Sequence, residues 1–227
     1  MISVIIPAYN EENTINEIIN RVLKVKIDKE VIVVDDGSVD RTPEILKELE
    51  KEKKIKLITL KRNYGKGFAI RKGLEEAKGE IIIIQDADLE LNPSDYYKLI
   101  EPLKKNECDI VYGVRFGYRK NWQGYRFISW VGNTVVTFFT NFLYNANLSD
   151  EATGYKVFKK SVLEKIKLEC IGFEFCPEFT AKALRNKFKI KEVPVEFNPR
   201  TYVEGKKIGW KDGFIALWVL LKERFKK

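Results

Sequence analysis

Two pairs of carboxylates in this chain each follow a run of strand-forming residues. Asp86 and Asp88 come just after the four isoleucines at 81–84, and Asp35 and Asp36 come directly after the Val-Ile-Val-Val run at 31–34. In an open α/β sheet, ligands bind in the crevice at the carboxyl ends of the strands. The two pairs therefore predict one site for a divalent cation and a polar ligand. The alternative is that they only cap the turns and helices that follow.

The residue types that are missing narrow the chemistry of such a site. The sequence contains no histidine, which excludes Ser-His and Cys-His catalysis and any His-ligated metal. Its three cysteines, Cys108, Cys170 and Cys176, lack the Cys-x-x-Cys spacing of a zinc site, and their odd number argues against a disulfide framework. A metal would therefore have only hard oxygen ligands, which favours Mg²⁺ or Mn²⁺.

Length and charge limit the size of the molecule and the kinds of partner it could bind. The 227 residues, 44% of them hydrophobic, suffice for one large domain or one domain with an extension. The net charge of +8 is compatible with nucleic acid, anionic lipid or phosphorylated ligands, and equally with a solvated surface rich in Lys and Glu. The first residues have no basic leader and resemble a strand, so we expect an intracellular protein.

Strands and helices alternate through the first half of the sequence. Strand-forming runs occur at 3–6, 31–34, 56–60, 80–84 and 109–112, and helical periodicity occurs at 13–24, 42–52, 67–77 and 94–104. Continuous apolar strands that alternate with helices predict a mostly parallel sheet with helices on both faces, which is a Rossmann-like α/β fold. Such a sheet would bring both acidic pairs to one edge.

An amphipathic helix is expected in the second half, where residues 127–149 contain no charge for 23 positions. Its apolar stripe comprises Phe127, Val131, Val135, Phe138 and Phe142, and its polar stripe comprises Ser129, Asn133, Thr137 and Asn141. Such a helix could pack on the domain, lie in a membrane interface or span a bilayer.

The segment at 210–225 has a similar character. Its apolar stripe of Trp210, Phe214, Leu217, Trp218 and Leu221 is flanked by Lys and Arg. Tryptophans beside cations are typical of a helix on a membrane surface. An ordinary amphipathic helix that closes the core is the alternative.

Four motifs in a fixed order resemble the family 2 glycosyltransferases, which have the GT-A fold. They are the opening strand and loop at 3–11, the segment at 33–42 around Asp35 and Asp36, the Asn-Tyr-Gly-Lys-Gly segment that begins at 63, and the Asp-Ala-Asp of residues 86–88. The resemblance covers roughly residues 1–205. It implies a catalytic domain over this range, with a nucleotide-sugar half at 1–113 and an acceptor half at 114–205, followed by an amphipathic helix within 206–227.

The resemblance implies roles for residues of the first half. The residues expected to bind a nucleotide-sugar are Pro7, Ala8, Tyr9, Glu11, Asp36, Asn63, Lys66, Gly67, Asp86 and Ala87. Asp88 would be catalytic as the direct ligand of Mg²⁺ or Mn²⁺, with Asp86 and Glu90 as supporting metal ligands. Departure of a nucleoside diphosphate develops negative charge on the β-phosphate, which a divalent cation would neutralise.

The second half is most similar to members of that family that load a sugar onto a polyprenyl phosphate, such as dolichyl-phosphate mannose or glucose synthases. The similarity lies at 111–115 with 126, 129 and 133, at 150–156, and at 194–207. It implies that Asp150 and Arg115 are catalytic and that the acceptor phosphate is held by Arg115, Arg126, Arg200 and Lys207. Glu90 departs from the mannose synthase pattern, in which a Gln is usual.

The acceptor decides whether a general base is needed. A hydroxyl must lose its proton to a carboxylate within hydrogen-bonding reach, and Asp150 and Glu151 are the candidates. A phosphate monoester is already anionic and needs cations instead, in which case Asp150 could orient them. Both alternatives stay open at this stage.

The sequence thus predicts an enzyme peripheral to the cytoplasmic face of a membrane. It would transfer glucose or mannose from a UDP- or GDP-sugar to a polyprenyl phosphate, and the resemblance implies an inverting displacement. Its expected partners are the donor, the lipid acceptor and the membrane surface, with a membrane-protein partner left open. Nucleic acid is not expected, because the basic residues are scattered. The main alternative is a family 2 enzyme that transfers to a glycan hydroxyl with Asp150 or Glu151 as base.

Overall fold

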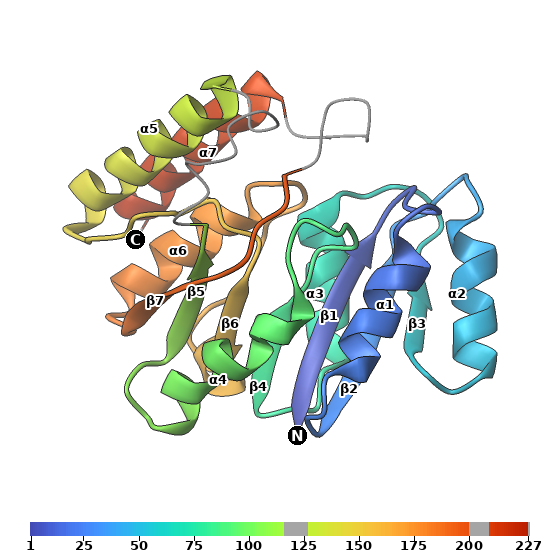
Figure 1. The fold of residues 1–227 in the computed structure, drawn as a ribbon. Coiled ribbons are helices and arrows are strands. Elements are labelled where there is room, and N and C mark those ends of the chain that lie inside the picture. Colours follow the sequence, from blue (N-terminus) through green and yellow to red (C-terminus); the bar gives the residue numbers. More distant parts are fainter. Residues whose placement is uncertain (116–126, 200–208, 227) are drawn as a thin grey trace.

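The structure, a computed structural model, describes residues 1–115, 127–199 and 209–226. Within them seven strands form one sheet in the order β3-β2-β1-β4-β6-β5-β7 (Figure 1). The strands are β1 (Ile2–Ala8), β2 (Lys29–Asp35), β3 (Lys56–Thr59), β4 (Ile81–Ile84), β5 (Ile110–Val114), β6 (Lys156–Lys159) and β7 (Ile190–Pro194). All neighbours run parallel except β6, which is antiparallel to both β4 and β5.

The strand β6 was not predicted, and its composition explains why. Its four residues begin and end with lysine, so no apolar run marks them in the sequence. The first lysine, Lys156, is fully buried, and its Nζ donates to the carbonyl of Glu151 at 2.8 Å. The same ammonium lies 4.0 Å from the centroid of the Tyr112 ring. These contacts compensate for burying a charge that would otherwise be costly.

Helices cover both faces of the sheet, as predicted (Figure 1). The first face carries α1 (Ile15–Lys24), α2 (Thr42–Lys51) and α4 (Tyr96–Lys104), and the second carries α3 (Lys66–Glu76) and α6 (Phe175–Arg185). The short 3-10 helices η1 (Pro93–Asp95) and η3 (Lys160–Glu164) precede α4 and follow β6. Successive side chains of β1 point to opposite faces of the sheet, so Val4 and Ile6 pack on the first face and Ile5 packs on the second.

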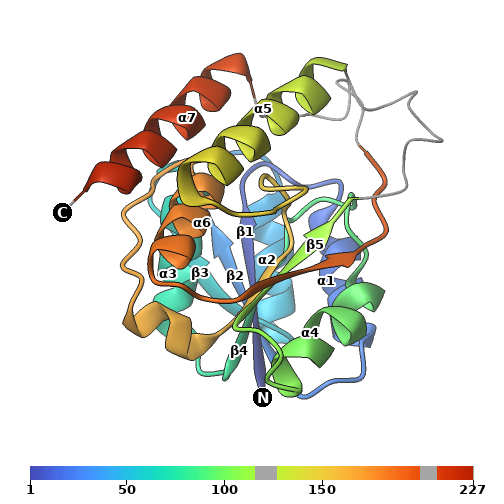
Figure 2. The same cartoon turned by 90° about the vertical axis from the view of Figure 1, so that its left-hand side faces the viewer.

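The helices α5 (Phe127–Tyr144) and α7 (Trp210–Phe225) lie side by side outside α6 and form a further layer (Figure 2). Val136, Ala181, Ala216 and Leu220 form a small buried cluster between the three helices. The Tyr144 hydroxyl donates to the Leu220 carbonyl at 2.7 Å. Of the helices described, none combines the length and the apolar character needed to cross a membrane.

The polar stripe of α5 faces the protein. Asn133 Nδ2 donates to Asp150 Oδ1 at 3.0 Å, and Thr137 Oγ1 accepts the N–H of Glu151 at 3.1 Å. Asn141 bonds both backbone groups of one residue in the following loop, at 2.7 and 2.8 Å. Buried backbone and carboxylate groups need such partners, which is why polar side chains lie inward here.

The apolar stripe of α5 consequently faces outward. Val135, Phe138 and Phe142 are 47%, 71% and 75% exposed. The helix does pack on the domain, as one alternative expected, but through its polar stripe and Val136 rather than through the predicted apolar stripe. The interfacial alternative stays a prediction.

Candidate active site

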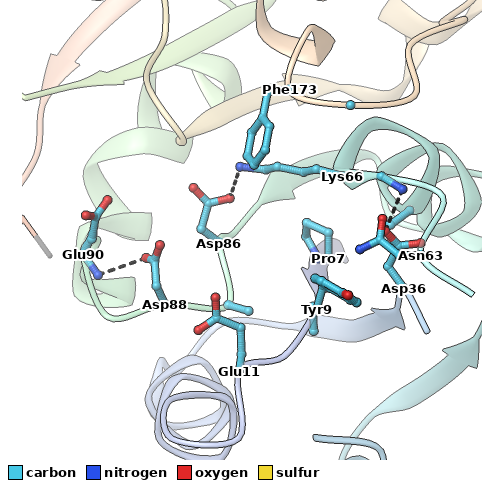
Figure 3. A pocket seen from close by; sticks show the side chains of 15 residues that line it. Pro7, Tyr9, Glu11, Asp36, Asn63, Lys66, Asp86, Asp88, Glu90 and Phe173 are labelled. Atoms are coloured by element: carbon cyan, nitrogen blue, oxygen red, sulfur yellow. Dashed lines mark hydrogen bonds and ion pairs between the residues drawn. The ribbon is translucent and has the colours of Figure 1, made fainter. Parts of the chain in front are cut away.

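A cavity of about 330 Å³ opens at the carboxyl ends of β1, β2 and β4 (Figure 3). It lies where the sheet order runs from β1 to β2 on one side and to β4 on the other, which is the ligand-binding position of open α/β sheets. Its walls are Pro7, Ala8, Tyr9, Glu11, Asp36, Asn63, Gly65, Lys66, Ala69, Asp86, Ala87, Asp88, Glu90, Gly172 and Phe173. Every residue predicted to bind donor or metal is among them except Gly67.

The carboxylate of Asp36 shapes one wall by holding the loop before α3. Its two oxygens accept the N–H groups of Tyr64 and Gly65 at 2.8 and 2.7 Å. Burial raises the pKa of Asp36 and Asp35 adds to this, although the two N–H donors oppose the rise. Gly65 has φ +108°, and a Cβ there would come within 2.4 Å of the Ile171 carbonyl oxygen, so only glycine fits.

The turn that carries the Asp-Ala-Asp motif starts from Gln85, a fully buried residue at the end of β4. Gln85 Oε1 accepts the hydroxyls of Tyr96 and Tyr155, both at 2.8 Å, and its Nε2 donates to the Asp86 carbonyl at 3.1 Å. These hydrogen bonds hold the start of the turn in place. No local pattern in the sequence marks Gln85, because its partners come from distant segments.

The carboxylates expected to hold a metal line one side of the cavity. Asp88 is 6% exposed, and its Oδ1 accepts the N–H of Glu90 at 3.0 Å. One oxygen of Asp86 is buried and has, apart from an ion pair with a lysine, no hydrogen-bond partner. Oxygen ligands with spare lone pairs suit Mg²⁺ or Mn²⁺, and Mg²⁺ is usually held by one or two carboxylates together with substrate phosphates. The residues thus fit a cation that binds with a diphosphate.

That oxygen, Asp86 Oδ1, lies 2.5 Å from Lys66 Nζ in an ion pair (Figure 3). The two side chains are 20% and 23% exposed, and Nζ lies 5.9 Å from the centroid of the Phe173 ring. Burial alone would lower the pKa of Lys66, but the charge of Asp86, helped by Cys176 and Asp88, outweighs burial and raises it. Lys66 is therefore cationic.

Phe173 and Gly172 belong to the wall but were not predicted. Their loop rests on the start of α3, where the N–H groups of Gly67 and Phe68 donate to the carbonyls of Gly172 and Ile171 at 3.0 and 2.9 Å. A Cβ on Gly67 would come within 2.9 Å of the Gly172 oxygen. The absence of a side chain at Gly67 thus lets this loop approach α3 closely, and the predicted role of Gly67 in ligand binding stays a prediction. The only feature of the sequence that could have indicated this part of the wall is a glycine followed by an aromatic residue, Gly172 and Phe173, just before α6.

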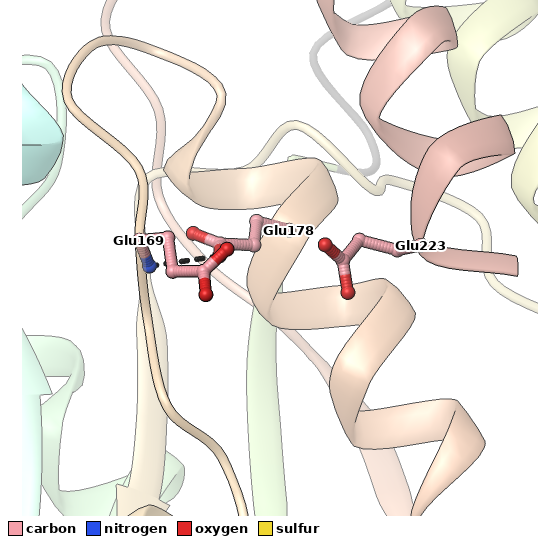
Figure 4. Close-up of side chains that lie close together, drawn as sticks. All are labelled: Glu169, Glu178 and Glu223. Carbon is pink, nitrogen blue, oxygen red and sulfur yellow. Dashed lines mark hydrogen bonds between the residues drawn. The ribbon is translucent and has the colours of Figure 1, made fainter. Parts of the chain in front are cut away.

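Acidic side chains also gather between α6 and α7 (Figure 4). Among the described residues, only Glu169, Glu178 and Glu223 form a group of three whose oxygens all lie within 4.8 Å of one another. Lysines neutralise it, since Lys182 Nζ lies 2.5 Å from Glu178 and Lys226 Nζ 2.7 Å from Glu169. We interpret this group as the anchor of α7 rather than as a metal centre.

Asp150 in the acceptor segment is fully engaged with a cation. The Arg115 guanidinium donates to both of its oxygens, at 2.6 and 2.8 Å, and Asn133 adds a further bond. Burial alone would raise the pKa of Asp150, but Arg115 and the hydrogen bonds hold it below its usual range. A carboxylate in this state is a poor proton acceptor and a good positioning group for Arg115.

Glu151, the other candidate base, lies away from the cavity. It is fully buried, and its Oε1 accepts the Thr180 hydroxyl at 2.8 Å. Burial raises the pKa of Glu151, and the nearby Lys156 only partly opposes this. The packed environment leaves no room for an acceptor beside this carboxylate.

The acceptor segment touches the metal motif directly. A Cβ on Gly154 would come within 2.5 Å of Asp86 Oδ2. On the other side, Arg115 lies 5.2 Å from the Phe197 ring centroid, and Phe197 is bridged to Leu91 in the loop that follows Asp88. Of the predicted acceptor cations, Arg115 is thus connected through Phe197 to the loop that follows Asp88, and its role stays a prediction, whereas Arg126, Arg200 and Lys207 lie outside the described residues.

Comparison with known proteins agrees with this geometry. Residues 3–167 match the model of Glycosyl transferase family 2. The chain is 34% identical to a dolichol-phosphate mannosyltransferase of Pyrococcus furiosus, over 90% of this chain but only 58% of that protein. It is 33% identical to a UDP-N-acetylglucosamine–dolichyl-phosphate N-acetylglucosaminyltransferase of Methanococcus voltae, over 86% of this chain and 85% of that protein.

Solved structures define the fold class. Glucosyl-3-phosphoglycerate synthase of Mycobacterium tuberculosis, crystallised with Mn²⁺, uridine diphosphate and phosphoglyceric acid, superposes with a TM-score of 0.77 at 18% identity, over 99% of this chain and 78% of that chain. The α/β sheet with its cavity at the β1 end is thus a GT-A fold, as predicted. The chain belongs to glycosyltransferase family 2 and is a glycosyltransferase.

Proposed function

We propose that this enzyme transfers a hexose from a UDP- or GDP-sugar to a polyprenyl phosphate. The observation that carries the proposal is the state of Asp150, whose two oxygens both bind Arg115. With Glu151 buried as well, neither candidate base is available to a hydroxyl acceptor, whereas an anionic acceptor needs none. The two curated relatives bear the names of dolichyl-phosphate sugar transferases, although this chain spans little more than half of the Pyrococcus protein.

The donor would occupy the cavity with its diphosphate toward the Asp-Ala-Asp turn. Pro7, Tyr9 and Asp36 line the part of the wall suited to the nucleoside, and Lys66 and Asp86 line the part suited to the diphosphate and sugar. Asp88, Asp86 and Glu90 would hold Mg²⁺ or Mn²⁺. When bound, the cation neutralises the charge that develops on the leaving diphosphate.

The reaction is a single displacement at the anomeric carbon. An oxygen of the acceptor phosphate attacks, the bond to the β-phosphate oxygen of the donor breaks, and its electron pair leaves with the nucleoside diphosphate. The attack comes from the face opposite the leaving group, so the configuration inverts. Arg115 holds the acceptor phosphate by paired hydrogen bonds, and Asp150 orients Arg115. Arg126, Arg200 and Lys207 complete the phosphate site in this proposal.

The same proposal places the enzyme on the cytoplasmic face of a membrane. The outward aromatic residues of α5 and α7 would rest in the bilayer interface beside the lipid acceptor, with Phe138, Phe142, Phe214, Trp218 and Phe225 between 65% and 75% exposed. The exposed cations Lys211, Lys222 and Arg224 on α7 suit anionic headgroups. These aromatic side chains lie on two helices that contact each other, and large exposed apolar side chains gathered on one side of a protein mark sites of protein or membrane binding.

A transfer assay tests the proposal. The purified chain would receive Mn²⁺ or Mg²⁺, labelled UDP- and GDP-sugars and a polyprenyl phosphate, and the mixture would be extracted with organic solvent. We expect metal-dependent label in the organic phase that is lost in Asp88→Ala, and an inverted anomeric configuration in the product. Label transferred only to a soluble glycan would reject the phosphate acceptor and favour the alternative with a hydroxyl acceptor.

A further inference from the structure

The cavity wall is strongly acidic and contains one cation. Among its fifteen described lining residues, Glu11, Asp36, Asp86, Asp88 and Glu90 are acidic, and Lys66 alone is basic. A donor diphosphate is itself anionic, so it would be repelled by this wall without compensating positive charge. The position of Lys66 therefore bears on how the cation and the donor enter the site.

Lys66 is directed at the motif that would hold the cation. Its Nζ lies 2.5 Å from Asp86 Oδ1 and 5.9 Å from the centroid of the Phe173 ring (Figure 3). Asp86 cannot easily turn away, because Gly154 packs against its other oxygen, within 2.5 Å of where a Cβ would stand. The ammonium thus occupies one oxygen of a predicted metal ligand.

We propose that Lys66 acts as a resident counter-ion of Asp86 that keeps the donor-free site from binding a divalent cation tightly. Metal and diphosphate then bind together, because the diphosphate draws the ammonium away from Asp86 while the cation takes its place. The predicted ligands Asp86, Asp88 and Glu90 do not form a closed group within 4.8 Å, so the protein alone offers an incomplete set that the diphosphate completes. This inference rests on the metal and the donor of the proposed function but not on its acceptor.

Mn²⁺ binding to the full chain without donor or lipid tests the inference. Free Mn²⁺ would be measured by electron paramagnetic resonance during titration of wild type, Lys66→Met and Lys66→Arg. We expect Lys66→Met to lower the Kd for Mn²⁺ by about tenfold, since a like charge close to the ligand is removed. Lys66→Arg keeps the charge and should stay near wild type. The control Lys72→Met removes a half-buried lysine from the same helix, paired to Glu75 at 2.8 Å, and should leave the Kd unchanged.

Two further measurements separate a direct ion pair from a general field effect. In an Asp86→Asn background the gain from Lys66→Met should disappear, because the pair no longer exists. With saturating Mn²⁺, Lys66→Met should bind UDP or GDP more weakly than wild type. An unchanged or raised Kd for Mn²⁺ in Lys66→Met, or an equal gain in the Asp86→Asn background, overturns the inference. Absence of Mn²⁺ binding by wild type even with UDP or GDP would in addition reject the metal-dependent function.

Discussion

Asp86 is the residue at which the donor and acceptor sides of the site meet. Lys66 contacts one of its oxygens, and Gly154 of the acceptor segment packs against the other. Its backbone carbonyl is held by Gln85. A side chain fixed from three directions keeps its orientation before any ligand arrives, which is what a group that must hold a cation in place requires.

Substitution of Gly154 should disturb the reaction through Asp86. In Gly154→Ala the new methyl group would meet Asp86 Oδ2 at 2.5 Å and Leu91 at 3.0 Å, so the carboxylate must shift. We expect sugar transfer to fall by about 10- to 100-fold, because displacements of this size strongly reduce catalysis. Steady-state transfer rates at saturating Mn²⁺ provide the measurement. Gly132→Ala is the matched control, because a Cβ at Gly132 meets nothing within 4 Å, and it should keep full activity.

The ion pair of Asp150 with Arg115 predicts a defined pH dependence of stability. Because the folded pKa of Asp150 lies below its ordinary value of 3.8, its contribution is complete above that pH and is lost as pH falls through the lower folded pKa. At pH 7 we expect Asp150→Asn to lower the free energy of unfolding by about 3 kcal/mol, since it strands a partly buried guanidinium. The difference from wild type should shrink below pH 3.8.

Urea unfolding between pH 3 and pH 7 measures this difference. The exposed pair of Glu101 with Lys105, at 2.6 Å, supplies the control. Glu101→Gln should change the free energy of unfolding by less than about 1 kcal/mol, as is usual for surface pairs. A difference for Asp150→Asn that stays constant or grows toward acid pH would contradict the assigned role.

At the scale of elements, the end of β4 depends on one buried amide. Gln85 Oε1 accepts hydrogen bonds from two tyrosine hydroxyls, those of Tyr96 at the start of α4 and Tyr155 just before β6. Gln85→Leu would leave both hydroxyls buried without an acceptor, so we expect a loss of about 2–4 kcal/mol in the free energy of unfolding. Thermal and urea unfolding would measure it. Tyr96→Phe, which removes a single donor, should cost about 1 kcal/mol, and equal stability of wild type and Gln85→Leu would refute this account.

The elements differ in how far their arrangement could be predicted from the sequence. The cavity walls at Asp36, Asp86 and Asp88 were predictable, because a strand-forming run determines where the strand ends and the polar residue lies just beyond it. Phe173 was not, because nothing local links it to Lys66, which it meets only through tertiary packing. For α5 the periodicity showed which residues share a face but not which face is covered.

Hydrogen bonds to residues 150 and 151 determine which face of α5 lies against the domain. Residues 150 and 151 present a carboxylate and an N–H that require partners, and Asn133 and Thr137 supply them. Their hydrogen bonds hold the polar stripe against the domain and leave the aromatic stripe outside. A periodicity argument that looks only at hydrophobic residues cannot include this requirement, since it depends on polar groups from another part of the chain.

At the scale of the whole molecule, the outer layer of α5 and α7 is connected to the acceptor side of the site. Asn133 on α5 and Arg115 both donate to Asp150, so the helix with the exposed aromatic residues contacts the group that positions Arg115, the arginine proposed to bind the acceptor phosphate. Under the proposed function, a lipid acceptor would have its phosphate near Arg115 and its chain toward this layer. The exposed aromatic residues of α5 and α7 should then bind bilayers.

Replacement of these aromatic residues should weaken membrane binding without loss of fold. Phe138, Phe142 and Trp218 are 71%, 75% and 65% exposed, so the triple substitution to serine should change the unfolding free energy by less than about 1 kcal/mol. Each side chain removed from the interface should cost about 1 kcal/mol of binding, which together lowers the affinity for anionic liposomes by roughly 100-fold in sedimentation assays. The control Val39→Ser alters a side chain that is 84% exposed beside β2 and should leave liposome binding unchanged. Undiminished binding of the triple variant would exclude α5 and α7 as the membrane-facing surface, and the lipid acceptor would then have to approach from another side of the molecule.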